Sequence, residues 1–425
     1  EEKIENTNIK TMPILPFIYF LLLMFYFWRK NRMFDTATAI TLFFVVSSLF
    51  AVLVDVYDLY SEYGINPKVV SLVGTFVYCA GITVVIYPFS KISISNIKTI
   101  SLKKPVLLNW FCYLVFISFL LYVGYNYENI YSSFVLDAAD IKSMHYEELS
   151  LSAKKSQPIY MYLVNIIVTS WSLVLCIWFY SISFLKKGIL FNAALLISSS
   201  AGILYGVTIA GRAALVYWVF AFFVFYSFFA PLMPNKVKRH IRILALILGA
   251  LILAFMAAIT ISRFADGEDN GAWFSFIGYA GQMYNNFCVF FEYGRDLPIT
   301  IERIMPITYK YILGGDFNLF DFYERIESTT GFYAACFYTV IGGLLINVGL
   351  IGMMIYLLLY YIIAYRMIKG FNKNPDFSYL IIYSLLLLVP IKGMFDIPFT
   401  GISDTLYIFF SIFLFWLFKY TFKYK

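Results

Sequence analysis

Residues 105–124 form an uncharged run long enough to cross a lipid bilayer, PVLLNWFCYLVFISFLLYVG. A bilayer core takes about 20 mainly apolar residues in one helix. Ten further apolar runs occur at 12–28, 36–54, 69–89, 158–183, 189–210, 212–231, 241–262, 349–366, 378–397 and 402–418. We therefore predict an all-α polytopic bundle of about 11 spans, with residues 1–425 forming a single integral membrane domain.

Composition supports the membrane class and excludes several others. Of the 425 residues, 61% are hydrophobic and 13% are charged, whereas soluble domains are about a quarter charged. The five cysteines show no pair spacing, so we expect neither a disulfide framework nor a zinc site. The sequence contains no HExxH, Walker or GxSxG motif, and we expect no metal and no cofactor. The net charge of +7 does not indicate nucleic-acid binding, because its sign differs between loops.

The basic residues predict the orientation of the spans. Alternate connections hold 19 of the 32 Lys and Arg residues, together with only two acidic residues, Asp35 and Asp376. The basic side of a membrane protein faces the cytoplasm. We therefore predict a multi-pass protein of the bacterial inner membrane with its C-terminus inside and Glu1 outside. Loss of a first helix by trimming would give the parent chain twelve spans.

Two predicted outer segments are long, at 125–157 and 263–348. Within the second, apolar residues recur at helical spacing from Trp273 to Phe291, with amide side chains on the other face. This pattern predicts an amphipathic helix along the outer membrane surface. The apolar run 331–347 is short, and we expect an interfacial or re-entrant piece that leads into the next span.

Arginines at the outer rim of the bundle are the first candidates for function, because charges are expensive there. Arg212 lies in a tight connection between small residues, and Arg263 follows the span 241–262. A guanidinium suits phosphate because it donates in a planar fork. The structural alternatives are contact with lipid headgroups for Arg212 and a salt bridge to Asp266, Glu268 or Asp269 for Arg263.

Other charged residues of the outer segments are weaker candidates. Arg325 precedes the run 331–347, and its structural alternative is pairing with a neighbouring glutamate. Arg303 is the first residue of a stretch of the second outer segment that ends at Gly314. Lys392 and Asp396 are one turn apart, and we predict a structural ion pair between them, with a role in the site as the alternative.

His145 is the only histidine of the predicted outer side, where it is either catalytic or merely solvated. The rings of Tyr279 and Tyr284 would either stack on sugars or anchor the helix at the interface. Asp55 and Asp58 would hold a metal and a sugar phosphate, although a solvated acidic helix end is the favoured interpretation.

Three segments in order carry a family resemblance. They are Gly211-Arg212, Arg263 with the aromatic helix from Tyr279 to Phe291, and the run from Ser328 to Gly352. With the 11–12-span layout, they resemble O-antigen (Wzy-type) polymerases, which join lipid-linked oligosaccharide repeat units. The resemblance implies transfer of a growing glycan from undecaprenyl pyrophosphate to an incoming lipid-linked unit on the outer face. It also implies contact with membrane lipids, a chain-length regulator and a flippase as partners, and no nucleic acid.

The same resemblance implies roles for the candidates. Arg212 and Arg263 would hold the donor pyrophosphate, and Arg325 the pyrophosphate or the acceptor. The base would be Glu327, Asp266 or Glu268. The substrate-binding residues would be Arg303, Lys392, His145, Tyr279 and Tyr284.

Two other functions stay open at this point. One is an O-antigen ligase or another GT-C-like glycosyltransferase, although His145 precedes the large outer segment, which counts against a ligase. The other is a flippase or exporter of lipid-linked oligosaccharide, which should carry charges at mid-helix in many spans. The charges of this chain cluster instead on the predicted outer side.

Overall fold

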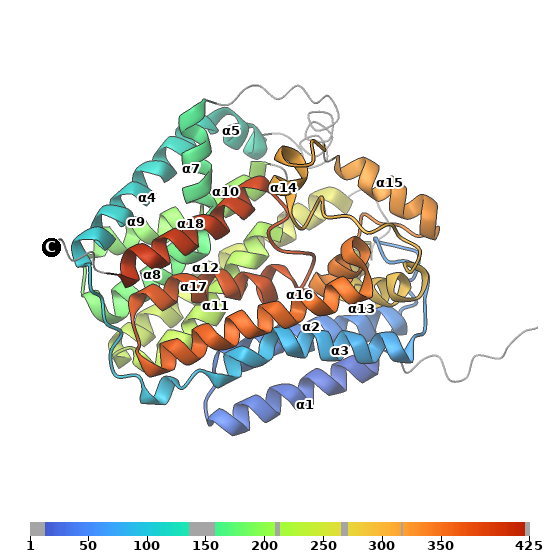
Figure 1. The fold of residues 1–425 in the computed structure, drawn as a ribbon, viewed down its shortest axis with the longest axis horizontal. Helices are drawn as coiled ribbons and strands as arrows, with labels where there is room; N and C mark the ends of the chain where they lie inside the picture. The colour runs from blue at the N-terminus through green and yellow to red at the C-terminus, as the bar shows by residue number, and fades with distance from the viewer. Residues whose placement is uncertain (1–12, 136–157, 209–212, 265–270, 316–317, 421–425) are drawn as a thin grey trace, which may run out of the picture. The chain divides into compact units, whose positions relative to one another are not determined.

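The computed structural model describes residues 13–135, 158–208, 213–264, 271–315 and 318–420, which form helices and their connections (Figure 1). The chain divides into two compact units. Unit 1 comprises Glu1–Ile92, Asp269–Arg366 and Leu388–Thr405, and unit 2 comprises Ser93–Glu268, Met367–Leu387 and Leu406–Lys425. Each unit is therefore built from segments that are distant in sequence.

Unit 1 is built on three N-terminal helices, α1 (Ile14–Asn31), α2 (Thr36–Val56) and α3 (Leu72–Ile86), the last continued by η2 (Tyr87–Lys91). To these the chain adds α13 (Gly271–Tyr293), α14 (Pro306–Tyr311) and α15 (Leu319–Thr330). Most of α16 (Thr339–Lys373) also belongs here, with the end of α17 (Phe377–Lys392) and the start of α18 (Ile402–Lys419). Both α1 and α13 pack on α2.

Unit 2 contains the middle of the chain and the remaining parts of α16, α17 and α18. Its own elements are η3 (Ile94–Asn96), α4 (Pro105–Tyr125), α5 (Tyr127–Val135), α7 (Ile159–Thr169), α8 (Trp171–Tyr180), η4 (Ser181–Leu185), α9 (Ile189–Ser199), α10 (Ala201–Thr208), α11 (Ala213–Phe229), η5 (Ala230–Leu232) and α12 (Asn235–Phe264). Aromatic side chains form its core, with Phe179 packing against Trp178, Phe222 and Phe229.

Connections that the basic-residue pattern assigns to one side of the membrane also lie together within each unit. In unit 2, Ser101 pairs with Pro375 and Asp376, and Lys104 Nζ donates to the carbonyl oxygens of Leu417 and Tyr420. In unit 1, segments 64–69, 333–337 and 393–396 meet at one end. The membrane face of each group stays a prediction.

The apolar helices identify a membrane protein. Fewer candidate spans are found among the described helices than the eleven that the sequence predicts. Six described helices are long and apolar enough to cross a bilayer: α2, α3 with η2, α4, α11 with η5, α16 and α18. A seventh span results if α7 and α8, which are bent by 52° at Ser170, are counted as one. Helices α9 with α10, and α17, are apolar but shorter. The full count of eleven stays a prediction.

Helix α13 is more buried than the surface helix that the sequence predicts. Its predicted range is right, but residues Gly281 to Phe291 are buried, including the amide face of Gln282, Asn285 and Asn286. An interfacial helix would leave that face in water. Here both faces are covered within unit 1, because α2 packs along one of them and the loop after α2 covers the other.

In the run 331–347, residues from Thr339 onward form a short helix that leads across a kink at Gly349 into the rest of α16. A separate piece therefore does precede the next span, and its position relative to the membrane stays a prediction. Gly349 interrupts α16 with φ 67° and ψ −179°, a conformation that suits a residue without Cβ. The backbone N–H of Thr300 donates to the carbonyl oxygen of Asn347 at 2.7 Å, beside the break.

We predict that Gly281→Ala destabilises the protein. A Cβ at Gly281 would lie 2.6 Å from the carbonyl carbon and oxygen of Phe50 in α2, which are backbone atoms and cannot rotate away. Such overpacking costs about 1–3 kcal/mol. The measurement is thermal unfolding in detergent, with Gly124→Ala as the matched control because nothing lies within 4 Å of its added Cβ. Equal melting temperatures for the two variants would contradict the close approach of α13 and α2.

Candidate functional site

The site candidates of unit 1 are positioned by the short helix α15. Asn318 caps its first turn by accepting from the N–H of Phe320, and Gly331 ends it in the left-handed conformation with φ 74°. Phe322 and Ile326 are one turn apart, so they lie on one face, which is buried. The charged residues of α15 lie on the remaining faces.

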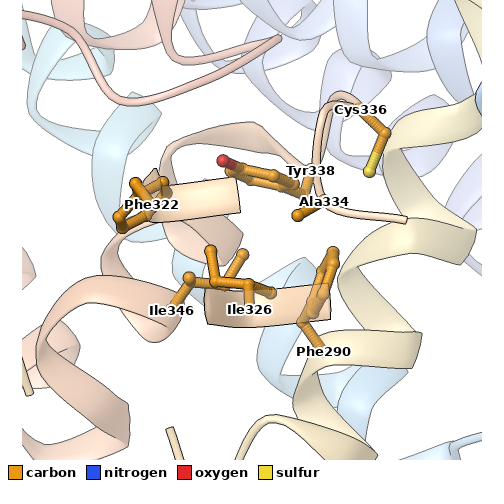
Figure 2. Close-up of a cluster of buried hydrophobic side chains, with 7 residues drawn as sticks. All are labelled: Phe290, Phe322, Ile326, Ala334, Cys336, Tyr338 and Ile346. Carbon is orange, nitrogen blue, oxygen red and sulfur yellow. The ribbon is translucent and has the colours of Figure 1, made fainter. Parts of the chain in front are cut away.

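An apolar cluster anchors α15 to the rest of unit 1 (Figure 2). Phe322 and Ile326 meet Phe290 of α13 and Ile346 of α16, and the other members are Ala334, Cys336 and Tyr338 of the connection between α15 and α16. Because these side chains are buried, α15 and the connection that follows it have a defined position on α13 and α16.

Arg303 is the most buried charged residue of the site, with 4% of its side chain exposed. It pairs with Asp396, and its Nη1 donates to the hydroxyl of Tyr338 at 3.0 Å. Its guanidinium lies 5.0 Å from the centre of the Phe322 ring. Burial by itself would lower the pKa of Arg303, but the Asp396 carboxylate outweighs burial and raises that pKa above its ordinary value.

Arg325 lies 5.5 Å from the same Phe322 ring and pairs with Glu302. The two partners differ in exposure, since 38% of the Arg325 side chain is exposed and only 6% of Glu302. Two guanidinium groups therefore share one aromatic ring, and a separate carboxylate balances each of them. Near them, burial raises the pKa of Tyr323 to about 12, so its phenol is neutral at ordinary pH.

The predicted ion pair between Lys392 and Asp396 is wrong. The Nζ of Lys392 lies 3.0 Å from Asp404 at the start of α18, and not beside Asp396 as the one-turn spacing predicted. Helix α17 ends at Lys392, and residues 393–395 form a turn that precedes Asp396. Spacing on an uninterrupted helix therefore does not apply to Asp396.

Hydrogen bonds from the start of α16 fix the connection between α17 and α18, which contains Asp396. The N–H groups of Tyr338 and Thr339 both donate to the carbonyl oxygen of Phe395, and that of Val340 donates to Gly393. Thr339 has φ 66°, which is unfavourable for a β-branched residue and is held here by these bonds. A Cβ at Gly343 would lie 2.3 Å from Ile397 and 3.1 Å from Asp396 Oδ1, so glycine allows this approach.

Three aromatic rings lie beside this connection. Tyr279 of α13, Phe337 and Phe395 have ring centres 5.0–5.9 Å apart in every pair. Phe395 is buried, whereas Tyr279 and Phe337 are partly exposed. Tyr284, the other tyrosine predicted to contact sugar, is buried and shares a hydrogen bond with Thr75 of α3. Its ring is enclosed by protein, so we keep only Tyr279 as a sugar-contacting candidate.

Amide side chains of α13 hold the loops of the site in place. Asn286 accepts from the backbone and side chain of Asn66 and donates to the carbonyl oxygens of Gly64 and Phe337. Asn66 in turn bonds both the N–H and the carbonyl of Tyr333. Gln282 accepts from the N–H of Phe337. The connection between α15 and α16 therefore bonds to α13 and to the loop after α2, a role that the polar pattern alone did not reveal.

Glu327, predicted as a catalytic residue, lies near the end of α15, where Oε1 accepts from the N–H of Ala334 at 2.9 Å. It is partly exposed. Its bond ties α15 to the connection that follows, so a structural role accounts for one of its two oxygens.

Four predicted candidates, Arg212, His145, Asp266 and Glu268, lie outside the described residues. Arg263 lies in the last turn of α12 in unit 2, and its side chain is outside the described part. Asp55 pairs with Lys68 and accepts from Tyr60. Among the described residues, no group of three His, Cys, Asp or Glu side chains is placed to hold a metal ion.

We predict that Asn286→Leu destabilises unit 1 by about 1–3 kcal/mol for each buried polar group left without a partner. The substitution removes the acceptor of the Asn66 amide and the donor to Gly64 and Phe337. Thermal unfolding in detergent measures the effect. Asn126→Ala is the control, since the side chain of Asn126, the C-cap of α4, donates to the carbonyl oxygen of Tyr122 one turn earlier. A loss no larger than that of the control would show that the network is not needed for folding.

A scan against protein-family models, a search of curated proteins and a search of solved structures each find no match to this chain. The functional inference therefore depends on the paired charges, the aromatic rings and the amide network just described.

Proposed function

We propose that this membrane protein is a glycosyltransferase that polymerises lipid-linked polysaccharide repeat units. It would transfer a growing glycan from undecaprenyl pyrophosphate to an incoming lipid-linked unit on the outer face of the bacterial inner membrane. The observation that carries the proposal is the ion pair of Arg303 with Asp396, the residue that follows Phe395, whose ring packs against that of Tyr279. Arg325 lies at the same Phe322 ring as Arg303. Charged groups and aromatic rings of this kind suit a sugar substrate that carries a phosphate.

The chemistry needs two kinds of group. The leaving pyrophosphate gains negative charge as the glycosidic bond breaks, and preorganised guanidinium groups stabilise such charge. We assign this role to Arg212 and Arg263, with Arg325 contacting the pyrophosphate or the acceptor. Arg303 is almost fully enclosed and paired, so we assign it a positioning role and not direct contact with substrate.

The distribution of charge favours this function over a flippase. The charged residues of unit 1 discussed above lie outside the long apolar segments or at the ends of helices. A passage for a lipid-linked sugar would need charges at mid-helix and openings on both faces. A ligase or another outer-face glycosyltransferase would use the same groups, and it differs in its product.

Arg325→Ala is expected to shorten the surface glycan. The substitution removes a partly exposed cation that the proposed reaction uses, and it leaves Glu302 unpaired. Gel analysis of extracted glycan gives the chain length. Arg295→Ala is the matched control, because Arg295 is a more exposed arginine of the same outer segment that pairs with Glu292. Equal shortening by the control, at equal protein level, would contradict a specific role for Arg325.

Arg212→Ala and Arg263→Ala test the donor site directly. A polymerase predicts surface material with a single repeat unit and accumulation of lipid-linked units outside the membrane. Units trapped on the cytoplasmic leaflet would identify a flippase instead. Normal-length polymer that is no longer attached to its final acceptor would identify a ligase, and unchanged long chains from both variants would refute the donor-site assignment.

A further inference from the structure

Asp396 is a carboxylate that the sequence analysis considered mainly as a partner for Lys392. It lies in the connection between α17 and α18, and 28% of its side chain is exposed, whereas its partner Arg303 is buried. One oxygen pairs with Arg303, and the other accepts from the N–H of Ile397 at 2.7 Å. Both contacts come from inside the protein, so they fix the direction of the carboxylate and leave part of it accessible.

The surroundings of Asp396 match what binds a sugar. Phe395, the preceding residue, packs against both Tyr279 and Phe337, and these two rings are partly exposed. Aromatic rings cover the apolar C–H face of a sugar, while a carboxylate accepts hydrogen bonds from its hydroxyl groups. The nearest cation, Arg303, is already balanced by Asp396 and enclosed, so this spot suits a hydroxyl group better than it suits a pyrophosphate.

We propose that Asp396, Tyr279 and Phe337 form the subsite for the terminal sugar of the acceptor, and that Asp396 takes the proton of the attacking hydroxyl. This inference rests on the proposed function. The hydroxyl oxygen forms a bond to the anomeric carbon of the donor, and the bond from that carbon to the pyrophosphate oxygen breaks. The bonding pair leaves with pyrophosphate, and the hydroxyl proton moves to an Asp396 oxygen. Asp396 replaces Glu327 as the assigned base.

The arrangement also explains why Arg303 is buried. Its contacts to Tyr338 and to the Phe322 ring hold it in one place. A fixed guanidinium in turn fixes Asp396, as a general base requires. Arg303 is then a positioning residue, and its partner is the group that reaches the substrate.

The test uses the purified full chain in liposomes, supplied with polyprenyl-pyrophosphate-linked repeat units. Asp396→Asn is expected to lower kcat by about 10²–10⁴-fold, the usual contribution of a general base. Asp404→Asn is the matched control, because it removes the carboxylate of the neighbouring ion pair, which joins Lys392 at the end of α17 to Asp404 at the start of α18. We expect its kcat to stay within about threefold of wild type, since general acid–base rate effects apply only to a group at the reacting atoms.

A purely structural role for Asp396 makes a different prediction. Exchanging the charges, with Arg303→Asp and Asp396→Arg together, restores an ion pair without a carboxylate at position 396. Recovery of both the melting temperature and polymerisation would overturn the proposal. Recovery of the melting temperature alone would support it. If the exchanged pair does not fold, Arg303→Met with Asp396→Asn removes both charges and is read in the same way.

Binding of the free oligosaccharide of one repeat unit separates this inference from the proposed function. Saturation-transfer NMR is expected to detect binding to wild type and a loss of at least about tenfold in affinity with Phe337→Ala, because the aromatic platform is a binding contact. Binding without any polymer from wild type would refute the polymerase and retain the glycan subsite. Polymer from wild type with full activity in Asp396→Asn would refute the base and retain the polymerase.

Discussion

The ion pair between Arg303 and Asp396 is the constraint around which one end of unit 1 is organised. A buried guanidinium without a partner is strongly unfavourable, by about 3–5 kcal/mol when a pair is broken. Arg303 therefore has to meet a carboxylate, and that carboxylate comes from a connection more than ninety residues later in the chain. Tyr338 and Phe322 complete its surroundings. Four segments, the loop before α14, α15, the start of α16 and the connection after α17, are fixed by the requirements of one side chain.

Buried backbone groups also need hydrogen-bond partners, and amide side chains supply them at this end of unit 1. Loops at the end of a helical bundle carry N–H and carbonyl groups that must find partners when they are covered. Asn66, Gln282 and Asn286 supply those partners for the segment 333–337. An irregular loop can therefore be buried against α13 and still present Phe337 beside Asp396. The proposed acceptor subsite depends on this, because its rings come from two segments that the amides and the apolar cluster around Phe290 hold together.

The sequence predicted apolar helices of the fold, but it did not predict which side chains contact one another. Apolar runs such as 36–54 and 105–124 correspond to α2 and α4, because span length and composition are properties of a single segment. The amide face of α13 was assigned to water, since the same residues serve a solvated face and a buried network equally well. The Lys392–Asp396 pair was wrong because α17 ends at Lys392, where Pro390 already lies inside the helix. Asp396 was thereby linked to the wrong cation.

The sequence identified Arg303 and Arg325 as candidate site residues, but it could not show which groups are buried around them. Arg303 and Arg325 do lie together, 5.0 and 5.5 Å from the centre of the Phe322 ring, yet Asp396 and Glu302 were not predicted as their partners. Glu302 was invisible as a partner because it lies 23 residues before Arg325. That pair has a chemical consequence. A pyrophosphate at Arg325 competes with Glu302, and Glu302 is too enclosed to turn to water when its partner leaves. Arg325 is therefore costly to recruit as the main cation for a diphosphate, and this end of unit 1 is better suited to an uncharged sugar.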